Sequence, residues 1–69
     1  MNVLFSERLK NLRVESNLTQ SQLAKIFNTT QRRISYFEIG KVEPDLETLC
    51  SIAKYFNVST DYLLGLTDY

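Results

Sequence analysis

Residues 19–38 read TQSQLAKIFNTTQRRISYFE, two short apolar patterns separated by a few polar residues. Thr19 and Gln22 have the spacing of a capping box, in which the two residues satisfy each other's free backbone amides at the start of a helix. The apolar stripe of this first helix consists of Leu23, Ile26 and Phe27. This spacing of three and four residues predicts a short amphipathic helix.

A second helix follows after a connection of only about three residues, 28–30. Thr30 is a suitable N-cap, and the helix is expected to run to about residue 38. Ile34 and Phe37 lie three residues apart and would anchor it in the core, while the small Ala24 lets the two helices cross closely. Such a tight joint requires a large angle between the helices. The stretch therefore predicts a helix-turn-helix at about residues 19–38.

The rest of the chain also favours helices. The patterns predict one over about residues 6–16, a fourth after the N-cap Asp45 and a short fifth between Ser59 and Gly65. Expected core positions of the fourth helix are Leu46, Leu49, Ile52, Ala53 and Phe56, and Cys50 is interpreted as a small core residue. The sequence as a whole predicts one all-α domain, a compact bundle of five short helices covering residues 1–69.

The helix at residues 30–38 has a polar face with a distinctive composition. At about 100° per residue, one arc carries Gln31, Arg32, Ser35 and Tyr36, and the opposite arc carries the apolar anchors. Gln and Arg are the side chains that pair with adenine and guanine edges in the major groove. A plain solvated helix face is the alternative, but the tight turn and the anchors favour a DNA-reading helix.

Composition excludes several other classes of function. The chain has no histidine and one cysteine, so it offers no nucleophile–base pair for catalysis and no obvious set of metal ligands. We therefore expect no enzyme, cofactor or metal, and one cysteine cannot form an internal disulfide. No apolar run approaches the roughly 18 residues needed to span a bilayer, so we expect no membrane segment. No small-molecule ligand is evident.

Net charge is zero, but residues 19–42 carry +3 and residues 43–69 carry −4. This asymmetry would give the molecule one face that attracts a polyanion and one that repels it.

Short motifs in fixed order extend along nearly the whole chain. They are Arg8-Leu9, Leu12-Arg13, Leu18-Thr19-Gln20, Leu23-Ala24, Ile34-Ser35, Phe37-Glu38, Gly40-Lys41, Glu43-Pro44, Leu46-Glu47-Thr48-Leu49, Ile52-Ala53, Phe56-Asn57-Val58-Ser59 and Asp61-Tyr62-Leu63-Leu64-Gly65. In these motifs the sequence resembles the Cro and phage-repressor type of helix-turn-helix regulator, also called xenobiotic-response-element-like. The resemblance implies the lambda-repressor-like fold and a DNA-binding transcription regulator.

The resemblance also implies roles for individual residues. The side chains implied to contact bases are Gln31, Arg32, Ser35 and Tyr36. Those implied to contact the DNA backbone are Thr19, Gln20, Arg33, Gly40 and Lys41, with Gln20 also bracing Gln31 and Gly40 acting through its amide. Arg13 is implied to pair with Glu38 as a structural ion pair. The chain departs from the family at Asn28, usually glycine, at Ile39, usually asparagine, and at Tyr36, often basic.

Together these observations predict a cytoplasmic transcription regulator, a repressor in particular, that binds double-stranded DNA as a homodimer on an inverted-repeat operator. The chain could be a complete small regulator or the head of a longer one. The alternative function is a protein-interaction module of the same fold, antitoxin-like or an anti-repressor, that binds no DNA. Tyr62, Leu66 and Tyr69 would either pack on the fourth helix or form a dimer contact.

Overall fold

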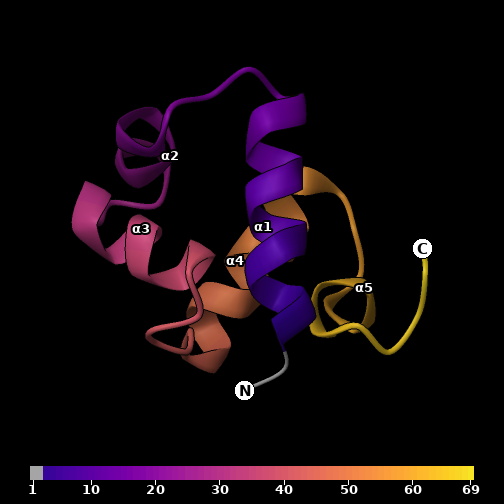
Figure 1. Ribbon diagram of the computed structural model, residues 1–69. Coiled ribbons are helices and arrows are strands. Elements are labelled where there is room, and N and C mark those ends of the chain that lie inside the picture. The colour runs from indigo at the N-terminus through magenta and orange to yellow at the C-terminus, as the bar shows by residue number, and fades with distance from the viewer. Residues whose placement is uncertain (1–2) are drawn as a thin grey trace.

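The computed structural model describes residues 3–69, which form short helices around one longer helix (Figure 1). In chain order these are α1 (Val3–Glu15), α2 (Gln20–Ile26), α3 (Gln31–Glu38), α4 (Leu46–Phe56) and α5 (Thr60–Leu64). No strand occurs among the described residues. In Figure 1, α2 and α3 lie together on one side of α1, and α5 lies on the other. The predicted all-α fold of five helices is confirmed, although α1 begins three residues earlier than expected.

Side-chain caps start three of these helices at the predicted residues. Asp45, the predicted cap of α4, occupies the N-cap position but makes no side-chain cap hydrogen bond. The Thr19 hydroxyl accepts the Gln22 amide at 3.0 Å, and the Thr19 amide donates to the Gln22 side chain at 2.8 Å, which completes the capping box. Thr30 and Ser59 each accept the amide three residues further on, at the starts of α3 and α5. These bonds satisfy backbone donors that have no partner within the helix, so short helices can start at fixed positions.

Residues in the left-handed region separate the helices. They are Asn17, Asn28 and Asn57, with φ between 55° and 59°, and Gly40 and Gly65, with φ of 77° and 82°. Asparagine tolerates this region better than other side chains because its short polar group can bond locally. The predicted stops after the first, second and fourth helices are therefore confirmed. Asn28 takes the left-handed conformation at the position where the family usually has glycine.

The core lies where α1 meets the other helices. Its ten buried apolar residues are Phe5, Leu9, Leu23, Ala24, Ile34, Phe37, Leu49, Ile52, Ala53 and Leu63. The Phe5 and Phe37 rings pack edge to face with centroids 6.1 Å apart, which joins α1 directly to α3. Ala24 is 3% exposed, and α2 packs closely against α3 as its small size allows. The core thus holds the helix-turn-helix against α1.

Three expected core positions are wrong. Leu46 is 80% exposed, Ile26 is 40% exposed, and Cys50 is also on the surface. The buried side of α4 is centred between Leu49 and Ile52, and Cys50 projects about 130° away from that direction on a helical wheel. Leu46 lies in the first turn of α4, and Ile26 lies in the last turn of α2, where little of the core remains to cover them. Their apolar character alone did not decide their burial.

This difference gives a test within one helix. Ile52→Ala should lower the free energy of unfolding by about 2–5 kcal/mol, because it removes a side chain with no exposed surface. Cys50→Ser, two residues away, should change it by no more than about 0.5 kcal/mol. Urea unfolding followed by circular dichroism measures both. A loss above about 1.5 kcal/mol for Cys50→Ser would place the thiol in the core after all.

Candidate nucleic-acid interface

Helix α3 divides its side chains between core and surface in the way the sequence predicts. Ile34, Phe37 and Glu38 are buried, while Gln31 and Arg32 are exposed. Arg33 is also exposed, and Ser35 and Tyr36 are half-buried. The helix therefore lies on the core through one face and presents a polar arc of hydrogen-bonding side chains on the other. The four residues expected to contact bases share this helix.

A chain of side-chain hydrogen bonds holds the start of this arc. The Gln31 amide donates to Gln20 Oε1 at 2.5 Å, which is the brace that the resemblance implied. Gln20 in turn donates from Nε2 to Glu38 Oε1 at 3.0 Å, a contact that the sequence analysis missed. Gln20 and Glu38 are eighteen residues apart in the sequence, so no local pattern indicated that they meet. These two hydrogen bonds connect Gln20 of α2 to the first and last residues of α3.

The Arg13–Glu38 ion pair extends this series of side-chain hydrogen bonds to α1. Arg13 Nε lies 2.6 Å from Glu38 Oε2 and Nη2 lies 3.0 Å from Oε1, so the pair is bidentate. Only 12% of the arginine side chain and 3% of the glutamate side chain are exposed. Arg13 also donates to the Leu18 carbonyl at 2.8 Å. One guanidinium therefore fixes the loop between α1 and α2 as well as the C-terminal end of α3.

The loop after α3 places Lys41 beside the reading arc. Its ammonium lies 4.6 Å from the centre of the Tyr36 ring, within the range of a cation–π contact. A groove of about 410 Å³ opens here, lined by Thr30, Arg32, Arg33, Tyr36, Val42 and Glu43. Val42 was not singled out from the sequence, and Glu43 was named only within the Glu43-Pro44 motif, without a role at this site. Their position directly after the Gly40-Lys41 motif was the available signal.

Gly40 contributes through its conformation. Its φ of 77° favours glycine, and a Cβ atom added there would lie 3.4 Å from the Ser6 hydroxyl of α1. Its amide already donates to the Phe37 carbonyl, so it is used within the end of α3. The phosphate contact implied for the Gly40 amide stays a prediction, and the turn at Gly40 positions Lys41. Ile39, just before it, is 68% exposed.

The Arg33 side chain makes contacts with other residues of the same chain. Its guanidinium lies 3.4 Å from Asp45 Oδ1 and 5.1 Å from the centre of the Phe37 ring. Both side chains of the ion pair are well exposed, at 44% and 60%. The pKa of Asp45 is lowered from its ordinary value, chiefly by a hydrogen bond with the Thr48 side chain and less by Arg33. A phosphate contact by Arg33 would have to compete with this carboxylate.

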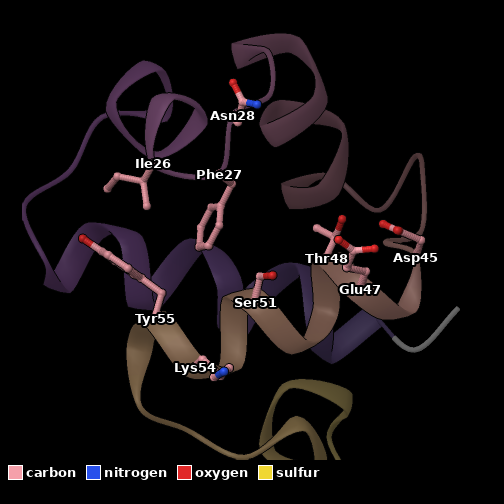
Figure 2. A pocket seen from close by; sticks show the side chains of 9 residues that line it. All are labelled: Ile26, Phe27, Asn28, Asp45, Glu47, Thr48, Ser51, Lys54 and Tyr55. Atoms are coloured by element: carbon pink, nitrogen blue, oxygen red, sulfur yellow. The ribbon is translucent and has the colours of Figure 1, made fainter.

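A second groove, of about 570 Å³, lies between the α2–α3 turn and α4 (Figure 2). Phe27 points from the turn toward α4, and its ring meets Tyr55 edge to face at 5.6 Å. Asp45 and Glu47 lie at one end. None of the residues expected to contact DNA lines this groove. Among residues 3–69, no three histidine, cysteine or acidic side chains gather as metal ligands would.

Comparison with known proteins places this geometry in a family. A family model described as helix-turn-helix matches residues 9–63. The chain belongs to the helix-turn-helix family of the Cro and phage-repressor type. This is a family of DNA-binding transcription regulators.

Individual members of the family are similar over most of the chain. A prophage-derived HTH-type transcriptional regulator of Bacillus subtilis, YonR, is 41% identical over 61 residues, which cover 88% of this chain and 56% of YonR. The HTH-type transcriptional activator BcrR of Enterococcus faecalis is 45% identical over 61 residues, covering 88% of this chain and 30% of BcrR. This chain thus spans about half or less of the length of these relatives.

A solved structure is similar over nearly its whole length. The P22 c2 repressor, determined in complex with a synthetic operator, superimposes with a TM-score of 0.82 at 33% identity. The match covers 88% of this chain and 92% of the repressor chain. The fold implied by the resemblance is therefore confirmed.

Within residues 3–69, no helix has the length and apolar character needed to cross a membrane.

The buried ion pair of this helix-turn-helix domain should matter for stability. Arg13→Ala leaves an enclosed carboxylate without its partner and should lower the free energy of unfolding by about 2–4 kcal/mol. Adding Glu38→Ala should restore part of that loss, because the two residues are coupled. Urea unfolding of the two single variants and the double variant measures the coupling.

Arg33→Ala is the matched control, since it removes an exposed Arg–carboxylate pair from the same domain. It should change stability much less than Arg13→Ala. Strictly additive losses for Arg13→Ala and Glu38→Ala, or equal losses for the two arginine variants, would contradict the role given to the buried pair.

Proposed function

We infer that the chain binds double-stranded DNA sequence-specifically, with α3 in the major groove, and acts as a transcription regulator, in particular a repressor. The observation that carries this inference is the exposed polar arc of α3, opposite its buried anchors. The similarity to a repressor determined with its operator supports the same function. The alternative of a protein-interaction module without DNA binding is not favoured by relatives named as transcriptional regulators.

The proposed contacts fall into two groups. Base edges are met by Gln31, Arg32, Ser35 and Tyr36. The DNA backbone is contacted by Thr19, Gln20, Arg33, Gly40 and Lys41, with Gly40 acting through its amide. Base contacts distinguish sequences, whereas phosphate contacts supply affinity and register on any sequence. Arg32 and Tyr36 both line the groove after α3, so this groove forms part of the proposed reading surface.

The protein is proposed to act in the cytoplasm as a homodimer, without a cofactor or enzymatic activity. One short helix reads only a few base pairs, which is too little discrimination for a site in a genome. Leu66 and Tyr69, 71% and 89% exposed, do not pack on α4 as one expectation had it. Tyr62 instead lies under the Arg8 guanidinium, 4.2 Å from ring centre to Cζ. The two exposed residues are available for a contact between protomers.

Selection of bound sequences from a random duplex pool, followed by binding titrations, tests the function. Arg32→Ala should weaken binding to the selected site and reduce the preference at one position per half-site by about 1–3 kcal/mol. Lys41→Ala should weaken selected and random duplexes by similar factors. The logarithm of the binding constant falls with the logarithm of salt concentration, and Lys41→Ala should reduce the magnitude of this slope by about one, because one phosphate contact is lost.

The preference at the position read by Arg32 should survive Lys41→Ala, which makes the two variants controls for each other. If Arg32→Ala weakened every sequence equally while Lys41→Ala changed that preference, the assignment of the two groups of contacts would be wrong. Absence of salt-dependent binding to any duplex by the wild-type chain would contradict the proposed function itself.

The dimer has its own test. Selected sites should contain two inverted half-sites with centres about one helical turn, roughly 34 Å, apart. Two chains should bind each duplex in sedimentation experiments. Leu66→Glu should weaken binding to the full site far more than to an isolated half-site if Leu66 lies between protomers. A single unrepeated half-site bound by one chain would rule out the proposed dimer.

A further inference from the structure

Four polar side chains connect α1 to the first residue of α3 through consecutive hydrogen bonds. Arg13 donates twice to the Glu38 carboxylate, Gln20 donates to the same carboxylate, and Gln31 donates to Gln20. Glu38 is the enclosed member, with 3% of its side chain exposed, and Gln31 is the exposed one. The series thus runs from a buried charge to the proposed reading surface.

The buried charge sets the direction of every bond in this series. A carboxylate held by a guanidinium has only acceptor atoms. Gln20 must therefore direct its NH₂ group toward Glu38, which leaves its oxygen facing Gln31. Gln31 must in turn direct its NH₂ group toward that oxygen. A flipped Gln20 would place two acceptor oxygens against each other in a poorly hydrated site, which is costly.

The direction of these bonds determines what Gln31 offers to DNA. One N–H of the Gln31 side-chain amide is used in the bond to Gln20. The side-chain oxygen and the second N–H remain available to DNA, in a fixed orientation. One acceptor and one donor on the same planar group match the N6 amine and N7 of adenine in the major groove. A flipped amide would exchange the two positions and lose that match.

We propose that Glu38 is a positioning residue for base recognition: its negative charge, acting through Gln20, fixes the amide orientation of Gln31 and thereby its preference for adenine. The proposal rests on the proposed DNA-binding function. It assigns to a buried residue, which touches no base, a measurable effect on sequence preference as well as on stability.

Glu38→Gln is the decisive variant because it keeps the shape of the side chain and removes the charge. Glu38 Oε2 accepts from Arg13 Nε at 2.6 Å, and Oε1 accepts both from Arg13 Nη2 and from Gln20 at 3.0 Å. The single oxygen of the amide should keep the shorter bond to Arg13 Nε, because an NH₂ group there would meet a donor at close range. The NH₂ group then takes the Oε1 position and faces Gln20, so Gln20 and then Gln31 should reverse. Wild type should prefer adenine opposite Gln31 by about 5- to 150-fold, and Glu38→Gln should reduce this to within about threefold. Titrations on single-base variants of the selected site measure the preference.

Gln20→Leu is the second variant and keeps the Arg13–Glu38 pair. It should reduce the same preference to within about threefold while the preference at the Arg32 position is retained, and adding Glu38→Gln should cause no further change. The proposal is overturned if Gln20→Leu leaves the Gln31 preference intact. It is also overturned if a folded Glu38→Gln protein retains the wild-type preference, or loses it equally at the Arg32 position.

The bond direction is tested without DNA by NMR of the free protein. In wild type, scalar coupling through the hydrogen bond should connect Gln31 Nε2 to the Gln20 side-chain carbonyl. In Glu38→Gln it should instead connect Gln20 Nε2 to the Gln31 carbonyl. An unchanged direction in the variant overturns the proposal. A wild-type protein with the expected coupling but no sequence preference would contradict the proposed function alone.

Discussion

The buried Arg13–Glu38 pair is the interaction on which the arrangement of the first three helices depends. Glu38 lies at the C-terminal end of α3, where the helix dipole disfavours a negative charge, and burial adds a desolvation cost. Only a partner with several donors can offset both. Arg13 meets the carboxylate with two bonds and also binds the Leu18 carbonyl. The pair therefore fixes both the position of α3 against α1 and the path of the chain into α2.

Apolar packing supplies the remaining constraint. Phe37, next to the buried carboxylate, packs against Phe5 of α1, and Ile34 lies one turn earlier in the same core. Helix α3 is only eight residues long and would not be stable in isolation. It forms because its N-cap, its apolar anchors and the ion pair all act on the same short segment. The same anchoring keeps the opposite face rigid, as a surface that reads another molecule must be.

The zero net charge of the chain is compatible with a polyanionic partner because the charges are segregated. Arg32 lies on the exposed arc of α3 and Lys41 lies beside it, whereas much of the acidic charge lies from residue 43 onward. Arg33 marks the boundary between these regions, because Asp45 at the start of α4 holds it. The distribution of charge, and not its sum, governs how such a domain would meet a phosphate backbone.

The sequence by itself determined the helices, the side-chain caps of α2, α3 and α5 and the division of α3 into buried and exposed faces. These features depend on residues within a few positions of one another. Thr19, Thr30 and the left-handed asparagines set the boundaries through local hydrogen bonds and backbone preferences. Tertiary structure alone decided that Gln20 meets Glu38 and that Cys50 lies on the surface. The physical reason is distance along the chain: which side chains meet, and which apolar groups are covered, depends on how separate helices pack, and local periodicity does not specify that.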